Sequence, residues 1–410
     1  MLKVLVVSSK YPPEYSGSGL RAHRTYQRLA KKYGLQFQVV ASSIVHNNSV
    51  AYEYEGVSVQ RIAGKCLSQV SLQRWDSRTG MNKLALRINY VSEMLLTWRY
   101  LSQNHYQYDV VHVFGNNAVV SAAITFCNRI KKPLVVEVTY DEDPRPYQPL
   151  IMKRVGRSQG DYHPTTRIIC ISKKLESRCR ELGLRNEIWT RPNPVDGKRF
   201  FPDFENRAVL RKKVSSFLPT DIVLVNVTKM MPLKNQSFLI DVLKQLPEQY
   251  KLVLAGPVEC AGPNAKRDQA YRREINEKIK SYGLVGRVEV VEKFITNPDE
   301  YMKMANVYVF PSVIEGLGTP LLESICCGVP VVAHRIIGVT DRWIVDGKNG
   351  YLSPLDVQEF AAKIEQAVNI PEKTLDQSAR ELIQVAGTDV IDQKYYELLC
   401  AAVRKEDNVK

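Results

Sequence analysis

Short runs of β-branched residues alternate with helical stretches along almost the whole chain, and this alternation most limits the possible fold. In the first half, the expected strands are Leu2–Ser8, Phe37–Ala41, Val57–Ile62, Val110–Phe114, Leu134–Thr139 and Arg167–Ser172. In the second half, they are Ile222–Thr228, Tyr250–Ala255, Val288–Val291, Val307–Phe310, Val329–Ala333 and Gly350–Leu352. Amphipathic stretches such as Arg21–Tyr33 and Lys173–Leu182 predict helices between them. The pattern therefore predicts an α/β protein with parallel, doubly wound sheets.

The length of the chain predicts more than one domain. A chain of 410 residues is too long for a single ordinary core, so two domains are expected. Prolines at positions 192, 194 and 202 interrupt the pattern, and we place a linker at about 193–203. The predicted domains are residues 1–198 and 199–388, and residues 389–410 form a final segment with a helix at Val390–Arg404.

The stretch FPSVIEGLGTPLLESICCGVP, residues 310–330, carries the strongest chemical signal. Glu315 and Glu323 stand eight positions apart, with a Gly-x-Gly turn and the start of an apolar helix between them. Glycines allow positive φ and close approach to a ligand, and the free N–H groups of a helix start attract an anion. The spacing fits a diphosphate, with Glu315 on a sugar hydroxyl and Glu323 on a ribose diol. A loop with two solvated acids is the alternative interpretation.

The complete string closely resembles the donor-binding signature of the retaining GT-B glycosyltransferases of family 4, the E-x7-E enzymes of glycosyl transferases group 1. The resemblance covers nearly the whole chain and is strong from about residue 165 to residue 355. It implies the GT-B fold: two Rossmann-like doubly wound domains with a cleft between them. The N-terminal domain would bind the acceptor, the C-terminal domain the nucleotide sugar, and the last helix would pack back on the N-terminal domain.

Lys229 and Lys234 lie on the expected loop after the first strand of the second domain. Two cations on such a loop can reach one diphosphate and neutralise the charge of a leaving group, although most loop lysines are simply solvated. The family carries Arg and Lys at this spacing; Lys229 keeps the charge but loses the bidentate fork of arginine. The resemblance thus implies Glu315, Lys234 and Lys229 as catalytic groups.

The resemblance also implies further donor contacts. A loop similar to the family's P-P-x-x-G-G segment, between the first strand and the first helix, contains Gly17 and Gly19. Gly256 and Phe294 would flank the base pocket. The expected donor site therefore comprises Gly17, Gly19, Lys229, Lys234, Gly256, Phe294, Glu315, Gly316, Leu317, Gly318, Thr319 and Glu323.

Two further residues are candidates for the acceptor side or the cleft. His112 lies in a segment that resembles the family's D-V-V-H-x-H strand end, with Phe114 where many relatives carry a second histidine. The place of His112 on a strand favours a histidine packed in the core over one that lines the cleft. Asp141 would lie at the cleft edge; together with Asp143 it could be taken for a D-x-D metal motif. That motif belongs to the GT-A fold, so we expect no metal ion and no cofactor.

The net positive charge of the chain lies in its first half. Residues 1–200 contain 30 Lys+Arg and 15 Asp+Glu, whereas residues 201–410 contain 27 and 28. The excess favours an anionic partner, such as a phospholipid surface or a lipid-linked acceptor, although a merely solvated basic surface explains it equally well. Nucleic acid is not expected, because no binding module is recognisable. The basic clusters are Arg21–Lys32, Arg74–Arg87 and Lys153–Arg157.

Cysteine spacing and hydropathy predict the location of the protein. Eight cysteines form no C-x-x-C pair, and neither a signal peptide nor an apolar run of about 18 residues is recognisable. A cytoplasmic protein is expected, either free or peripheral on the cytoplasmic membrane face.

The function expected from these features is metal-independent hexosyl transfer, with retention, from a UDP- or GDP-sugar to a glycan or lipid-linked acceptor of the cell envelope. A nucleotide-sugar epimerase with the GT-B fold and a soluble small-molecule glycosyltransferase are the alternatives. A non-catalytic protein with a decayed site is disfavoured, because both glutamates and both lysines are retained.

Overall fold

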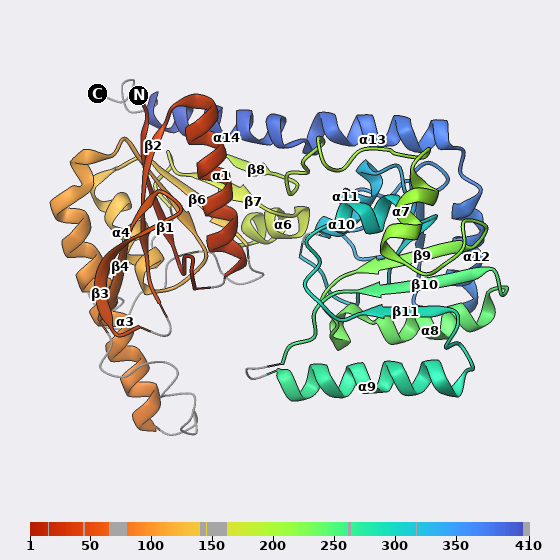
Figure 1. The fold of residues 1–410 in the computed structure, drawn as a ribbon. Coiled ribbons are helices and arrows are strands. Elements are labelled where there is room, and N and C mark those ends of the chain that lie inside the picture. Colours follow the sequence, from red (N-terminus) through yellow and green to blue (C-terminus); the bar gives the residue numbers. More distant parts are fainter. Residues whose placement is uncertain are drawn as a thin grey trace. The chain divides into compact units, whose positions relative to one another are not determined.

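The computed structural model describes residues 1–14, 16–43, 46–64, 80–139, 145, 162–260, 264–316 and 318–404, with the backbone alone at 80–83. The chain divides into two compact units (Figure 1). The first unit comprises residues 1–191 and the residues from 392 onward, and the second comprises residues 192–391. The division thus falls within the last helix, α14 (Thr388–Arg404).

The first unit contains an eight-stranded sheet in the order β3-β4-β2-β1-β5-β6-β7-β8. Its strands are β1 (Lys3–Ser8), β2 (Gln36–Ala41), β3 (Asn48–Tyr54), β4 (Val57–Gly64), β5 (Val110–Phe114), β6 (Leu134–Val138), β7 (Arg167–Cys170) and β8 (Ile188–Thr190). All neighbouring strands are parallel except β3 and β4. Its helices are α1 (Gly17–Tyr33), α3 (Gly80–Asn104), η1 (His105–Gln107), α4 (Ala118–Ile130) and α6 (Lys173–Glu181).

The second unit contains a six-stranded, fully parallel sheet in the order β11-β10-β9-β12-β13-β14. Its strands are β9 (Ile222–Val227), β10 (Tyr250–Ala255), β11 (Val288–Val291), β12 (Val307–Phe310), β13 (Val331–His334) and β14 (Gly350–Ser353). Its helices are α7 (Arg207–Val214), η2 (Pro232–Lys234), α8 (Gln236–Gln245), α9 (Ala265–Ser281), α10 (Pro298–Lys303), α11 (Thr319–Cys326), α12 (Val357–Val368) and α13 (Glu372–Ala386). The order is that of a doubly wound Rossmann sheet, and it reverses between β9 and β12.

Helices cover both faces of the second sheet, and each face has its own apolar core. One core joins the sheet to α10 and α11, with Met302, Leu322 and Ile325 among its members. The other joins it to α8, α9 and α12, and includes Leu243 and Ile275. A sheet buried on both faces needs continuous apolar strands, which explains why β-branched runs predicted these strands well.

The twelve strands expected from the sequence are present, with ends that differ by up to two residues. The pattern missed β3 and β8. Strand β3 is an exposed antiparallel edge that reaches β4 through Glu55 and Gly56, which both have positive φ (47° and 76°). A hairpin of this kind interrupts the alternation of strand and helix on which the prediction rested.

One expected loop is part of a helix. Helix α1 begins at Gly17, so Gly17 and Gly19 lie in its first turn and not between the first strand and the helix. Ser16 is the N-cap, and its hydroxyl oxygen accepts a hydrogen bond from the Gly19 N–H at 2.8 Å. A Cβ on Gly19 would lie 2.3 Å from the carbonyl oxygen of Lys10, so glycine lets the helix start against this segment.

Candidate active site

An ion pair marks the place where the strand order of the second unit reverses. Lys234 ends η2 after β9, and Glu315 lies in the loop after β12, the strand beside β9. The Lys234 ammonium donates a hydrogen bond to the Glu315 carboxylate, and both side chains keep some exposure, 22% and 12%. The Val313 N–H donates to the Leu233 carbonyl at 3.0 Å, which joins the two loops. Parallel α/β sheets bind ligands at this position, outside the carboxyl ends of the strands.

Helix α11 begins directly after this pair. Gly318 is its N-cap in a left-handed conformation, with φ of 58°, and the first turn contains no acidic residue. Gly316 lies outside the positive-φ region, so the positive φ expected at both glycines occurs at Gly318 and not at Gly316. The Asn193 amide donates to the Thr319 hydroxyl, which fixes the first helical residue. The first turn of α11 therefore contributes no acidic side chain of its own at the positive end of the helix dipole.

Glu323 lies in the second turn of α11 and is half-buried. Burial raises the pKa of its carboxyl group to about 7, while Arg199 lowers this pKa and Asp299 raises it. Its carboxylate accepts no hydrogen bond from the residues that the structure describes. A carboxylate whose oxygens accept no hydrogen bond from the described protein residues can accept hydrogen bonds from two neighbouring hydroxyl groups of a ligand.

Lys229, the other expected cation, is held by two acids that the sequence did not reveal. Its ammonium donates to the Glu259 carboxylate, and the fully buried Asp268 Oδ2 lies 3.2 Å away. Burial lowers the pKa of Lys229, but Glu259 and Asp268 outweigh it, so the net shift is upward. Glu259 follows β10 and Asp268 lies in the first turn of α9; no sequence motif links them to the loop after β9.

The two remaining candidates of the second unit follow β10 and β11: Gly256 comes directly after β10, and Phe294 lies shortly after β11. Gly256 has φ of 153°, and a Cβ there would lie 1.9 Å from the Thr228 carbonyl oxygen, so only glycine fits. Phe294, after β11, is 76% exposed. The candidates of the second unit thus follow the carboxyl ends of four adjacent strands, β11, β10, β9 and β12.

His112 is a core residue of the first unit. It is fully buried, its Nδ1 lies 2.7 Å from the Tyr26 hydroxyl, and its ring packs against Phe114. Burial lowers the pKa of His112 to about 3, with Glu137 opposing this shift, so the ring is neutral at physiological pH. His112 is therefore packed in the core of the first unit, the interpretation that its place on a strand favoured. Asp141 and Leu317 lie outside the described residues.

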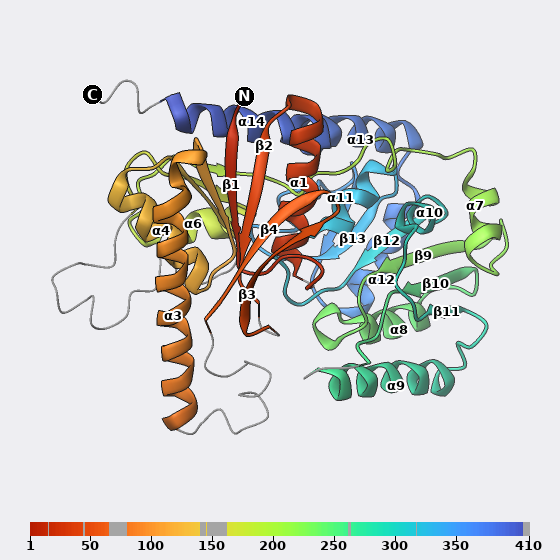
Figure 2. The same ribbon diagram turned by 60° about the vertical axis from the view of Figure 1, so that its left-hand side comes forward.

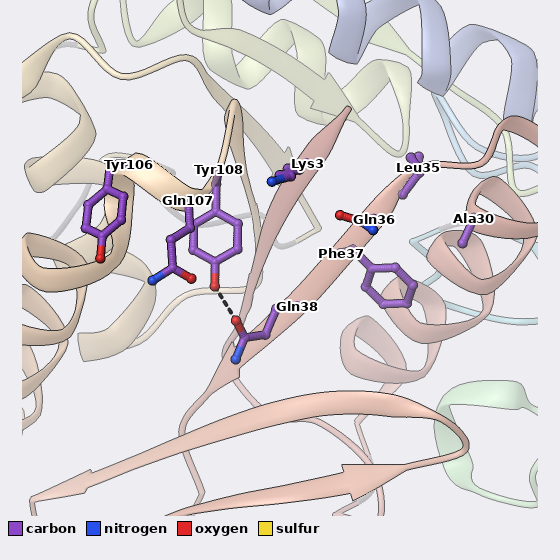
Figure 3. A pocket seen from close by; sticks show the side chains of 9 residues that line it. All are labelled: Lys3, Ala30, Leu35, Gln36, Phe37, Gln38, Tyr106, Gln107 and Tyr108. Atoms are coloured by element: carbon purple, nitrogen blue, oxygen red, sulfur yellow. Dashed lines mark hydrogen bonds between the residues drawn. The ribbon is translucent and has the colours of Figure 1, made fainter. Parts of the chain in front are cut away.

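One sizeable cavity lies elsewhere, in the first unit. Its volume is about 720 Å³, and Figure 3 shows its lining residues, among them Lys3, Gln36, Gln38 and Tyr108. Lys3 and Gln36 begin β1 and β2, so the cavity opens at the amino ends of these strands. Among the described residues that line it, Lys3 alone is charged. A diphosphate site is therefore not supported there.

In the part of the chain that the structure describes, none of the helices has the length and apolar character of a membrane span. Nor do three or more histidine, cysteine, aspartate or glutamate side chains gather there as metal ligands would. Asp143, like Asp141, lies outside the described residues.

Residues 210–382 match the family model described as Glycosyl transferases group 1. Lys229, Lys234, Glu315 and Glu323 all lie within the matched range.

Two curated proteins are similar over parts of the chain. The capsular polysaccharide biosynthesis glycosyltransferase CapM of Staphylococcus aureus is 31% identical over 107 residues, which is 26% of this chain and 26% of CapM. A GDP-mannose-dependent alpha-(1-6)-phosphatidylinositol monomannoside mannosyltransferase of Mycolicibacterium smegmatis is 30% identical over 166 residues, 39% of this chain and 41% of that protein. The chain thus spans less than half the length of these relatives.

A solved structure extends the likeness to almost the whole chain. HepE of Anabaena, in complex with UDP, has a TM-score of 0.70 and 18% identity, and the superposition covers 98% of this chain and 100% of HepE. At this identity the likeness concerns the fold, and it confirms the expected GT-B fold.

Proposed function

Since this chain belongs to the glycosyl transferases group 1 family, we propose that it is a retaining glycosyltransferase with a nucleoside-diphosphate-sugar donor. The observation that carries the proposal is the Lys234–Glu315 pair at the reversal of strand order, beside the start of α11. Cation, carboxylate and helix dipole meet where doubly wound sheets bind nucleotides. The donor diphosphate would lie against Lys234 and the helix start.

The two glutamates would bind the two ends of the donor. Glu315 would orient the transferred sugar through a hydroxyl group, and Glu323 would accept hydrogen bonds from the ribose diol. Because Glu315 also holds Lys234, a diphosphate at this position would compete with Glu315 for the cation. The carboxylate would then be available to the sugar while the ammonium binds phosphate.

The reaction would break the bond between the anomeric carbon and the diphosphate oxygen, and an acceptor oxygen would bond to that carbon on the same face. The departing diphosphate oxygen would take the acceptor proton, so no general base is needed and the configuration is retained. Negative charge grows on the diphosphate as this bond breaks, and Lys234, Lys229 and the dipole of α11 would stabilise it. No step requires a metal ion.

The acceptor we propose is a glycan or lipid-linked glycan of the cell envelope. CapM is named for capsular polysaccharide biosynthesis, and the Mycolicibacterium protein for a phosphatidylinositol monomannoside acceptor and a GDP-mannose donor. HepE was solved with UDP. These names support UDP- and GDP-sugars as the donors to try first.

The test is an assay of purified protein with UDP- and GDP-sugars and extracted envelope glycolipids. We expect release of nucleoside diphosphate that depends on the acceptor, persists with EDTA, and gives a product whose anomeric configuration matches that of the donor by NMR. Glu315→Gln should lose this activity. Release of a free sugar epimer without an acceptor would instead establish an epimerase, and inversion or loss on chelation would contradict the proposed mechanism.

A further inference from the structure

Helix α3 buries polar side chains against the rest of the first unit. Asn89, Glu93 and Thr97, which are spaced by four residues, are 4%, 6% and 0% exposed. The Ser42 hydroxyl donates to the Glu93 carboxylate at 3.2 Å, and the Thr97 hydroxyl donates to the Glu93 carbonyl at 2.7 Å. Helix α3 packs against α4 and β4. The contact between α3 and its unit therefore includes buried polar side chains beside apolar ones such as Leu101 and Trp98, which packs on Phe126.

The opposite side of the same helix is apolar and exposed. Leu84, Ile88, Val91 and Leu95 are 58%, 46%, 39% and 66% exposed. At about 100° per residue, their spacing places them in one strip about 60° wide, opposite Glu93. We call these four residues the α3 stripe. A surface helix normally turns such a strip toward the core, so its exposure needs an external explanation.

Positive charge borders the stripe on both sides. Arg87 and Arg99 are exposed, and their helical positions lie on either side of the strip. Glu93, which is buried, is the only acidic residue between positions 80 and 104. Both views show that one end of α3 extends beyond the strands of its unit (Figures 1 and 2). The stripe thus has apolar residues at its centre, cations at its borders and no acid.

This combination fits an anionic bilayer better than a second copy of the chain. Apolar side chains with flanking arginines are typical of helices that lie in the headgroup region of a membrane. Pairing two α3 helices through the stripe would bring arginines of like charge together, with no acid on this face to compensate them. Moreover, four side chains on one helix are small beside the roughly 800 Å² per partner of a stable protein interface.

We propose that the α3 stripe docks in the interfacial layer of an anionic phospholipid membrane. The four apolar side chains enter the acyl boundary, while Arg87 and Arg99 lie at the lipid phosphates. Arg87 belongs to one of the basic clusters expected to meet a membrane, whereas Arg74 and Lys153–Arg157 lie outside the described residues. The inference rests on α3 alone and does not depend on the transfer reaction.

The experiment is co-sedimentation of the full chain with vesicles of phosphatidylcholine alone or mixed with phosphatidylglycerol. We expect binding to the mixed vesicles, weakened by high salt, and little binding to neutral ones. Leu84→Gln with Leu95→Gln should lower the partition coefficient at least about tenfold, since each loses a buried leucine side chain. Arg87→Gln with Arg99→Gln should also lower it, and should remove part of the salt dependence.

A matched control comes from the second unit. Val209 and Val285 are 65% and 67% exposed, as much as the stripe leucines, and Val209→Gln with Val285→Gln should leave vesicle binding unchanged. All variants should unfold at the temperature of the unmodified protein. Binding that is equal for both lipids, or unaffected by the stripe substitutions, would overturn the proposal. So would a dimer in light scattering that only the leucine substitutions dissociate, because the stripe would then be an interface between copies.

Discussion

At the scale of single residues, the two lysines of the candidate site differ in how firmly acids hold them. Among the residues that the structure describes, Lys234 is paired with Glu315 alone, whereas Lys229 contacts both Glu259 and the fully buried Asp268. An incoming diphosphate has to compete with these carboxylates. Lys234 is therefore the more available cation, and we expect it to contribute more to stabilising the leaving group.

Replacement of Lys234 should affect the chemical step more than donor binding. The diphosphate carries more negative charge in the transition state than in the donor, so Lys234→Ala should lower kcat about a hundredfold and change KM far less. Lys229→Arg should remain active. Lys213→Ala, which removes the lysine of the surface pair with Glu300, is the matched control and should leave both constants unchanged. Equal kinetics for Lys234→Ala and the control would remove Lys234 from the reaction.

The raised pKa of Glu323 predicts a pH dependence of donor binding. Below about pH 7 its carboxyl group is largely protonated and accepts hydrogen bonds poorly; above this pH the carboxylate is present. Affinity for the nucleotide should therefore rise as pH increases through about 7. In Glu323→Gln this rise should disappear, and calorimetric titrations at several pH values compare the two proteins. The same rise in Glu323→Gln would assign the titration to another group.

At the scale of structural elements, Gly256 holds together the loops that carry the site. Its Cβ-free backbone lets the turn after β10 lie against the Thr228 carbonyl at the end of β9. The Gly256 N–H also donates to the Val291 carbonyl of β11 at 3.0 Å. Three strand ends are thereby kept at a fixed spacing.

Substitution of Gly256 should be costly. Gly256→Ala combines a severe overlap with the Thr228 carbonyl oxygen and a φ of 153°, so it should destabilise the protein by roughly 2–5 kcal/mol. Gly286→Ala is the control, because a Cβ at Gly286 would meet no atom within 4 Å. Urea unfolding monitored by circular dichroism measures both. A cost for Gly256→Ala no larger than that of the control would show that the turn can relax.

Strands that are buried on both faces of a sheet were predictable from the sequence. Helix α3, whose buried face is recognisable only from its contacts, was not. Runs such as Val307–Phe310 contain no charged residue and are buried throughout because helices cover both faces of the sheet. Helix α3 escaped prediction because its buried face carries Asn89, Glu93 and Thr97, which reverses the usual amphipathic pattern.

The same distinction applies to the candidate site. Glu315, Glu323 and Lys234 belong to local motifs, and the Lys234–Glu315 contact follows from two loops that the fold places side by side. Asp268, by contrast, reaches Lys229 from a helix 39 positions further along the chain and belongs to no motif. Such contacts depend on tertiary packing, which periodicity does not encode.

At the scale of the whole molecule, a buried charge network joins the end of the chain to the sheet of the first unit. Glu137 on β6 is fully buried and accepts hydrogen bonds from Arg191 at 2.6 Å and from the Tyr395 hydroxyl of α14 at 2.6 Å. Arg21 of α1 reaches the same carboxylate at 3.1 Å. A single carboxylate thus links residues more than 250 positions apart.

This network should make stability sensitive to acid. Burial alone would raise the pKa of Glu137, but Arg191 and Arg21 outweigh it and lower the pKa from 4.5 to about 2. The ionised Glu137 carboxylate therefore contributes roughly 3 kcal/mol to the free energy of unfolding. This contribution is complete above about pH 4.5 and is lost as pH falls toward 2.

Thermal unfolding of Glu137→Gln at several pH values measures this contribution. The variant should be markedly less stable at pH 7, because it leaves buried arginine charge unpaired, and the difference from the unmodified protein should shrink below pH 4.5. Glu381→Gln, which removes a surface pair with Lys348, should change little. A difference that is constant with pH would mean that Glu137 does not carry the charge assigned to it.

The central claim is that the carboxyl ends of β9 and β12 hold the diphosphate of a nucleotide donor. Calorimetric titration of UDP and GDP into the unmodified protein, Glu323→Ala and Lys234→Ala tests it most directly. We predict that at least one nucleotide binds and that each substitution weakens its binding about tenfold to a hundredfold, as expected for loss of a charged hydrogen-bond partner. The free nucleoside diphosphate carries the charge of the leaving group, so Lys234→Ala should weaken its binding far more than it raises the KM of the nucleotide-sugar donor. Binding of neither nucleotide, or affinities unchanged by both substitutions, would contradict the account.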